Sequence, residues 1–214
     1  AFAELITVEN ISEKISSSEL DHIFKGQLDT AGITTEDSSK KFKFIHLNGA
    51  HVPYIYDKEM NIINEWDGTY EQSTQATLFG AMDYVEQLRE SGAYDNTAII
   101  VMSDHGFNGS LAQSGDATWM RQCAMLLVKG RNEHHDTMQI SRAPISFEDL
   151  QEAYVRLLDG EQSDSIFDWK EGDVRERRFL RYSFLDDSYM QEYMQTGYAS
   201  DMDTMILTGR EYNR

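Results

Sequence analysis

An acidic residue and a histidine stand side by side at Asp104 and His105, and Gly106 follows them. A carboxylate oxygen and an imidazole nitrogen are common ligands of divalent cations. Neighbouring residues of a regular strand point to opposite faces, so both side chains could reach one ion only where the strand has already turned. Taken alone, the dipeptide is more typical of a loop aspartate that bonds its own backbone beside a solvated histidine.

A second candidate is His51, which is followed by Val52, Pro53 and Tyr54. A histidine held near a rigid proline could donate a hydrogen bond to an anionic ester oxygen or protonate a leaving group. The alternative for this tetrapeptide is a surface histidine in a turn. The two histidine-containing segments therefore suggest ester chemistry at a metal site without establishing it.

Composition narrows the possible partners. The 214 residues are 40% apolar and 26% charged, as in soluble globular proteins, and no apolar run approaches the roughly 18 residues of a membrane span. The formal net charge of -18 would repel a polyanion, so nucleic acid is not an expected partner. A small anionic substrate would need a bound cation to offset that charge. Cys123 is the single cysteine, which excludes an internal disulfide and a thiolate metal cage.

The candidate residues follow predicted strands. Apolar alternation predicts a strand over residues 42–47, just before His51, and a β-branched run predicts a buried strand over residues 97–102, just before Asp104. Between them, three- and four-residue spacing predicts a helix over residues 71–91, with Gly92 as its stop. The expected inner stripe of this helix is Leu78, Ala81, Met82, Val85 and Leu88.

The pattern continues with a strand over residues 124–128, a helix capped by Ser146 and a strand over residues 179–184. The expected inner stripe of this second helix is Leu150, Ala153, Tyr154, Leu157 and Leu158. Alternating strands and helices predict an α/β fold with a mostly parallel sheet flanked by helices. Ligands of such folds bind beyond the carboxyl ends of the strands, where both His51 and Asp104 fall.

Four segments, taken in order, resemble the C-terminal half of sulfatase-like enzymes of the alkaline phosphatase superfamily. They are FKFIHLNGAHVPY, then Tyr70 to Gly92 leading into YDNTAIIVMSDHG, then MRQCAMLLVKG, and finally RAPISFEDLQEAYVRLLDG. The ending YMQEYMQTGYASDMDTMILTGREY is similar to the tails of membrane-anchored bacterial members related to lipoteichoic acid synthase. The resemblance implies a partial domain, in which residues 42–214 form the C-terminal portion of a catalytic domain and residues 1–41 are a polar lead-in.

The resemblance also implies roles. Asp104 and His105 would bind a divalent metal, calcium or manganese before zinc, and His51 would bind the sulfo or phospho group and act in catalysis. The activity would be a metal-dependent hydrolase or transferase of sulfuric or phosphoric esters, acting on a small anionic ester or a lipid-linked phosphate or sulfate. The full-length protein would work at the extracytoplasmic face of the membrane, anchored through an upstream region, whereas the chain itself would be soluble.

The family's nucleophile, a cysteine, serine or threonine well upstream, has no counterpart in the sequence, and Cys123 lies after the metal pair. We therefore expect the chain to be a fragment that is inactive alone. The segment after Gly106 also lacks the additional histidine or lysine of many arylsulfatases. The alternatives are a phosphoglycerol-type transferase or phosphodiesterase of the same superfamily, or a non-catalytic α/β binding module with a vestigial metal pair.

Overall fold

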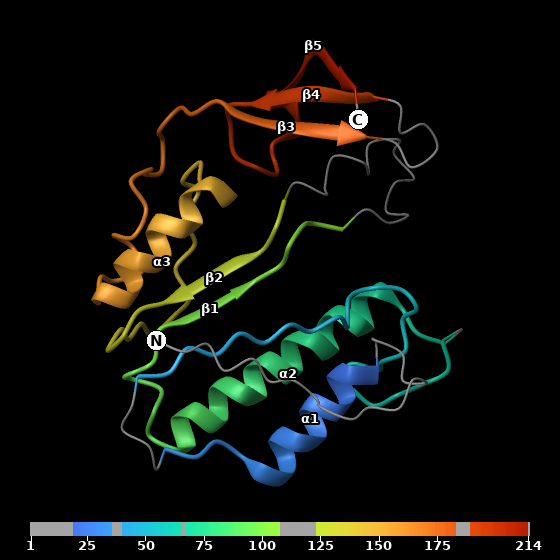
Figure 1. The fold of residues 1–214 in the computed structure, drawn as a ribbon, viewed down its shortest axis with the longest axis vertical. Helices are drawn as coiled ribbons and strands as arrows, with labels where there is room; N and C mark the ends of the chain where they lie inside the picture. The colour runs from blue at the N-terminus through green and yellow to red at the C-terminus, as the bar shows by residue number, and fades with distance from the viewer. Residues whose placement is uncertain (1–18, 36–39, 66, 108–122, 183–188, 214) are drawn as a thin grey trace. The chain divides into compact units, whose positions relative to one another are not determined.

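The computed structural model describes residues 19–35, 40–65, 67–107, 123–182 and 189–213 (Figure 1). Much of the predicted polar lead-in, residues 1–18, lies outside this part of the chain. The chain divides into two compact units, Ala1–Asp95 and Asn96–Arg214, and each is described by itself. No helix among the described residues is long and apolar enough to cross a membrane.

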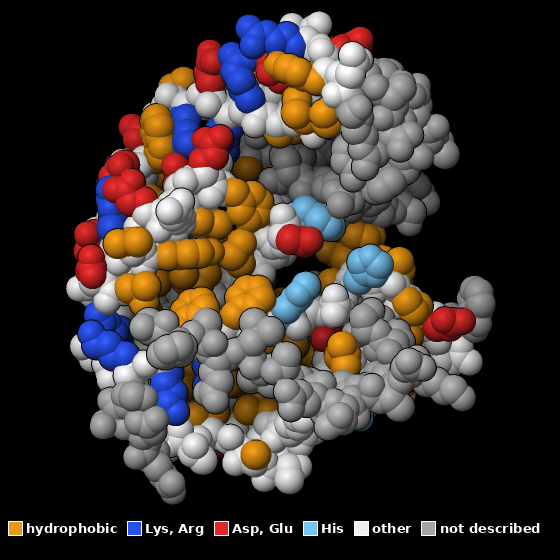
Figure 2. Space-filling view, in the orientation of Figure 1, with side chains coloured by type: hydrophobic (Ala, Val, Ile, Leu, Met, Phe, Trp, Pro, Cys, Tyr) orange, Lys and Arg blue, Asp and Glu red, His pale blue; other side chains and the backbone are white. Residues whose placement is uncertain are grey.

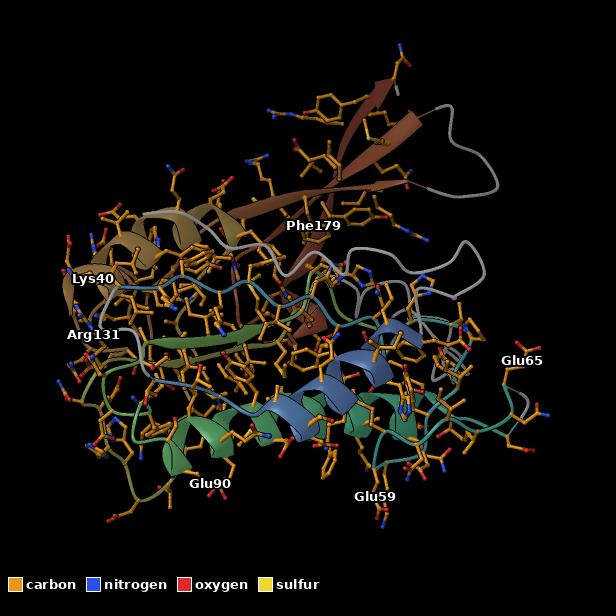
Figure 3. All side chains as sticks on the ribbon, turned by 60° about the horizontal axis from the view of Figure 1, so that its bottom comes forward. Lys40, Glu59, Glu65, Glu90, Arg131 and Phe179 are labelled. Carbon is orange, nitrogen blue, oxygen red and sulfur yellow. The ribbon has the colours of Figure 1, made fainter. Side chains whose placement is uncertain are left out.

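The first unit contains helices α1 (Leu20–Ala31) and α2 (Tyr70–Glu90), which lie side by side (Figures 1 and 3). A capping box starts α2, since the Thr69 hydroxyl accepts the Gln72 N–H and the Gln72 side chain accepts the Thr69 N–H. The helix ends before Gly92, whose φ of 73° is left-handed. The predicted helix and its glycine stop are confirmed.

The buried face of α2 differs in part from the prediction. Val85 and Leu88 are buried as expected, but Met82 is 53% exposed. The buried face also includes the small residues Ser73, Ala76 and Gly80. These small side chains let the segment that contains Tyr56 and Met60 approach the helix, and Tyr56, Met60 and Ala76 form the buried core of this unit. A count of large apolar residues misses a contact of this kind.

The predicted strand over residues 42–47 is not formed in the described structure, where only Phe42 makes an isolated bridge. Phe42 and Phe44 are 52% and 62% exposed. Apolar alternation favours an extended chain, but a strand also requires a hydrogen-bonded neighbour along its length. The segment nevertheless leads into a turn at Asn48–His51, where the His51 N–H donates to the Asn48 carbonyl.

In the second unit, β1 (Ile99–Met102) pairs with β2 (Leu126–Lys129) in an antiparallel ladder. Ile100 faces Val128 in this ladder, and both pack against Ala153, Leu157 and Ile166. Ala153 and Leu157 belong to α3 (Leu150–Asp159), which follows a single 3-10 turn, η4 (Phe147–Asp149). The core of the second unit thus lies between α3 and one face of the two-stranded sheet.

The cap and the inner stripe predicted for α3 are confirmed in part. The Asp149 carboxylate accepts the Ser146 N–H at 2.7 Å, which is one half of a capping box, whereas the Ser146 hydroxyl has no partner among the described residues. Ala153 and Leu157 are buried as expected. Leu158, in contrast, is 63% exposed. The helix contains only ten residues and contacts the sheet along a narrow stripe, so a residue next to Leu157 already points away from the core.

The strands β3 (Arg177–Tyr182), β4 (Tyr189–Gln195) and β5 (Met205–Asn213) form a second antiparallel sheet in the order β3-β4-β5, with a 3-10 turn η5 (Met202–Thr204) before β5 (Figure 1). The α/β class is therefore confirmed, but the expectation of mostly parallel strands is wrong for the described residues. Parallel neighbours need a long crossover, usually a helix. Here α2 precedes β1 and α3 follows β2, so no described helix separates the two paired strands.

Candidate metal site and the His51 turn

The ladder between β1 and β2 fixes the position of Asp104. Beyond the last β1 residue, Met102, the Ser103 N–H donates to the Met125 carbonyl at 3.1 Å, and the Ser103 hydroxyl accepts the Met125 N–H at 2.9 Å. The chain then bends at Asp104 and His105. This bend removes the alternation of a regular strand, so the two side chains can turn toward one another as the sequence required.

The two side chains of the pair do converge. Nε2 of His105 lies 3.5 Å from Oδ2 of Asp104, while Oδ1 of Asp104 accepts the His105 backbone N–H at 2.9 Å. Nδ1 of His105 lies 2.7 Å from the Gly106 carbonyl oxygen, so Nδ1 donates the proton in this bond because a carbonyl can only accept. Asp104 is exposed and His105 is partly exposed, which leaves the pair accessible to an ion.

This donor set fits a divalent cation. With the proton of a neutral imidazole on Nδ1, Nε2 presents a lone pair toward the Asp104 carboxylate, and a cation, a proton or a water molecule that donates hydrogen bonds would offset the repulsion between the two electron-rich atoms. Two ligands of one ion, each about 2.1 Å from it, typically lie about 3 to 4 Å apart. A bond from the second ring nitrogen to a backbone carbonyl is also the usual support of a metal-binding histidine.

His51 lies in a turn of the first unit and has a similar local bond. Its backbone N–H donates to the Asn48 carbonyl at 2.7 Å, and its Nδ1 donates to the Val52 carbonyl at 2.6 Å. Nε2 is therefore the ring atom left for a ligand. The side chain is exposed, and Figure 2 shows histidine side chains at the surface of the displayed face.

The structure brings Asp104 and His105 together within the second unit, whereas His51 belongs to the first unit. A site shared by all three residues stays a prediction. In the described part of the chain, no group of three or more His, Cys, Asp and Glu side chains is placed to hold a metal ion. Metal binding by Asp104 and His105 therefore stays a prediction.

Cys123 has surroundings unlike those of a nucleophile. Its Sγ donates to the Ala199 carbonyl at 2.9 Å, and burial raises the pKa of the thiol despite the nearby charge of Arg177. A raised pKa keeps the thiol protonated, and the reactive species of cysteine is the thiolate. This agrees with the expectation from the sequence that Cys123 does not serve as the nucleophile.

Sequence reasoning missed two positioning residues. The Ser103 hydroxyl accepts the Met125 N–H immediately before the Asp104–His105 pair. Asp21 of α1 accepts the Asn48 N–H and so supports the turn that contains His51. Ser103 gave little signal, because a serine beside a turn is common. Asp21 gave no clearer one, because an acidic residue in the first turn of a helix is ordinary and its burial is visible only in the structure.

Comparison with known proteins supports the fold. No family model and no curated protein matches the sequence. A solved structure, that of the carrageenan sulfatase Ps i-CgsB in complex with k-i-k-neocarrahexaose, is similar with a TM-score of 0.54 and 20% sequence identity. The match covers 85% of this chain and 44% of the sulfatase, so the chain spans less than half the length of that enzyme. The chain therefore has a sulfatase-like fold that corresponds to part of a domain.

Proposed function

We propose that this chain supplies the metal-binding part of the active site of a sulfatase-like enzyme that acts on sulfuric or phosphoric esters. The observation that carries the proposal is the 3.5 Å approach of His105 Nε2 to Asp104 Oδ2, with Nδ1 of His105 bonded to a carbonyl. The sulfatase-like fold supports the same class of enzyme. The fold alone would also suit a binding module, so the pair is the decisive feature.

Each residue has a distinct role in this proposal. Asp104 and His105 would hold the cation, and the Gly106 carbonyl keeps the imidazole proton on Nδ1 so that Nε2 faces the cation. A divalent cation would neutralise non-bridging ester oxygens and lower the pKa of a nucleophile. His51 is proposed to bind the transferring group through Nε2, and in its protonated form Nε2 can donate to an ester oxygen or a leaving group.

The charge of the chain supports a cation at this site. With a formal net charge of -18, the protein would repel a sulfate or phosphate ester unless a local positive charge dominated where the ester binds. Calcium or manganese is the proposed ion, because both bind the carboxylate oxygen of an aspartate. A chelator should therefore weaken anion binding by the folded protein.

The substrate and its location are also part of the proposal. We propose a small anionic ester or a lipid-linked phosphate or sulfate as substrate, on the resemblance of the tail sequence to lipoteichoic acid synthase relatives. The same similarity supports a location at the extracytoplasmic face of a membrane. Whether the bond cleaved is a sulfate or a phosphate ester is to be decided by substrate profiling of an enzyme that includes the upstream region.

Calorimetric titration with Mn²⁺ and with Ca²⁺ tests the metal pair. The wild-type chain should bind one ion, and Asp104→Asn should weaken binding at least about tenfold because it removes a charged oxygen ligand. Asp136→Asn is a matched control, since Asp136 is an exposed aspartate that also stands next to a histidine, His135. Equal affinities in all three proteins would contradict the assignment.

The second test concerns activity. The proposal assigns the nucleophile to none of the 214 residues, so the pure chain should not hydrolyse p-nitrophenyl sulfate or p-nitrophenyl phosphate above the rate of the His51→Ala variant. Rapid hydrolysis that depends on His51 would show that the chain contains a nucleophile of its own. If the chain joined to its upstream region is also inactive and binds no metal, the binding-module alternative gains support.

A further inference from the structure

Helix α1 contains a buried carboxylate that the fold alone does not require. Asp21 is 1% exposed, and its Oδ1 accepts the Asn48 N–H at 3.0 Å. Its Oδ2 has no hydrogen bond of normal geometry to any described residue, although the neighbouring Gly49 N–H adds electrostatic support. A buried charge with one unsatisfied oxygen destabilises a fold, and an apolar side chain of similar size would avoid that loss.

The groups bonded to Asp21 belong to the turn that holds His51. Asn48 is fixed from two sides, because its N–H donates to Asp21 and its carbonyl accepts the His51 N–H at 2.7 Å. The turn is therefore anchored one bond away from the backbone of His51. The His51 ring is then oriented by the 2.6 Å bond from Nδ1 to the Val52 carbonyl.

Packing beneath the turn leaves it little freedom. Gly49 is buried, and a Cβ atom at this position would collide with the Thr77 hydroxyl and lie 3.2 Å from Asp21 Oδ2. Thr77 is itself fixed by a 2.8 Å bond to the Ser73 carbonyl within α2. The turn thus rests directly on α1 and α2, and a glycine is needed for this close approach.

The energetics point to a role in function. Burial raises the pKa of Asp21, although the backbone N–H groups of Asn48 and Gly49 and the charge of His46 act in the opposite direction. The carboxylate is therefore held at a cost to stability, and the bonds that offset part of this cost go to one loop. Locally unfavourable groups of this kind are concentrated at functional sites, where the surrounding structure enforces them.

We propose that Asp21 is a positioning residue for His51, holding the turn at Asn48 and Gly49 so that Nε2 of the protonated His51 ring is preset to donate to an oxygen of a sulfo or phospho group. This proposal rests on the function proposed for His51. Asp21 touches no substrate. Its effect passes through the backbone of the turn, so changing Asp21 should alter the orientation of the His51 ring and the affinity for a tetrahedral anion together.

Long-range ¹H–¹⁵N NMR of the 214-residue chain tests this role, because it reports the tautomer of each histidine ring. In the wild type, His51 should be fixed with the proton on Nδ1. Asp21→Ala should average the His51 tautomers, shift the Asn48 amide resonance and weaken sulfate binding at His51 about tenfold. Asp21→Asn keeps an oxygen acceptor and should preserve the His51 tautomer, and Asp29→Asn, an exposed change on the same helix, should have no effect.

An unchanged His51 tautomer and unchanged sulfate affinity in folded Asp21→Ala would overturn the proposal. If Asp21→Ala does not fold, Gly49→Ala carries the test, because it displaces the turn from Asp21 while leaving the carboxylate in place. Gly49→Ala should then release the His51 ring, and a ring that stays fixed would again overturn the proposal. Absence of sulfate binding in the wild type would refute the proposed function of His51, whereas the tautomer measurement would still report on Asp21.

Discussion

Asp21 in the first unit and Glu133 in the second are both buried carboxylates, and the two are bonded to very different extents. Glu133 in the second unit accepts hydrogen bonds on both oxygens, from the Gly130 N–H, the Ser163 N–H and hydroxyl, and His135 Nε2. Asp21 in the first unit has a bond of normal geometry on one oxygen alone among the described residues. Burial acts on both, but the bonds lower the pKa of Glu133 to about 2, whereas the pKa of Asp21 is raised.

This difference separates a stabilising carboxylate from a positioning one. Glu133 ties the end of β2 to the segment after α3, at the end of the second unit where Figure 3 labels Arg131. Its full set of bonds more than offsets the loss of hydration. Burial of Asp21 lowers the stability of the fold, and its one bond of normal geometry among the described residues goes to a single turn. This arrangement indicates that the turn has a role beyond stability. Variants of the two residues should therefore behave in opposite ways.

The largest effect on stability is expected from Glu133→Ala. Removal of the carboxylate leaves several buried donors unpaired, so the free energy of unfolding should fall by roughly 3 kcal/mol. Urea denaturation at pH 7 measures this change. Glu161→Ala, an exposed change nearby, should stay within about 0.5 kcal/mol of the wild type. A similarly small loss in Glu133→Ala would show that the bonds around Glu133 contribute little.

The pH dependence of Glu133 follows from the same bonds. Its folded-state pKa of about 2 lies below the usual 4.5, so its contribution is present above pH 4.5 and is lost as the pH falls toward 2. Acid titration of wild type and Glu133→Ala should therefore converge in stability at low pH. If the difference in stability between the wild type and Glu133→Ala stayed constant down to pH 2, the lowered pKa of Glu133 would be contradicted.

A smaller effect is expected from Ser103→Ala, which removes the bond between the Ser103 hydroxyl and the Met125 N–H. The loss should be about 1 kcal/mol of stability and roughly threefold to tenfold in Mn²⁺ affinity, because Asp104 follows directly. Ser141→Ala is the matched control, since that hydroxyl accepts a backbone N–H in an exposed loop. Loss of stability without loss of metal affinity would mean that Ser103 does not position the pair.

The smallest change in stability is expected from Asp21→Asn. The folded-state pKa of Asp21 is raised, so this group favours folding below its unfolded pKa of 3.8 and loses that contribution as the pH rises through its folded pKa. The asparagine variant should therefore gain stability relative to the wild type between pH 4 and pH 7. Thermal melts across this range measure the difference in stability between the wild type and Asp21→Asn. If the wild type instead became more stable relative to the variant as the pH rises, Asp21 would behave like Glu133, and the contrast between the two carboxylates would be wrong.

The sequence allowed the elements around Asp104 to be predicted, whereas the strand expected over residues 42–47, before His51, is not formed in the described structure. The helix over residues 71–91 and the strand before Asp104 were recoverable because their patterns and caps are local. The antiparallel pairing of β1 with β2 was not, since pairing depends on contacts distant in sequence. Strands β4 and β5 were missed because their polar, Met- and Tyr-containing sequence lacks a clear apolar alternation.

At the candidate site, the proposed ligand residues could be predicted from the sequence, but the hydrogen bonds that orient them could not. Asp104 and His105 could be proposed from their chemistry and their place after a strand, and the bend that lets them converge is present. The bond from His105 to the Gly106 carbonyl and the clamp by Ser103 depend on backbone geometry, which a sequence pattern does not specify. The burial of Asp21 beneath the His51 turn likewise appears only once the helices are packed.

The central claim is that Asp104 and His105 share one divalent cation, and Mn²⁺ titration followed by NMR of the histidine rings tests it most directly. The account predicts that the His105 resonances broaden first at substoichiometric Mn²⁺, that Asp104→Asn abolishes this selectivity and that Asp136→Asn retains it. Lowering the pH should release the ion, because a proton competes for Nε2. Equal broadening of all exposed histidines, unchanged by Asp104→Asn, would contradict the claim.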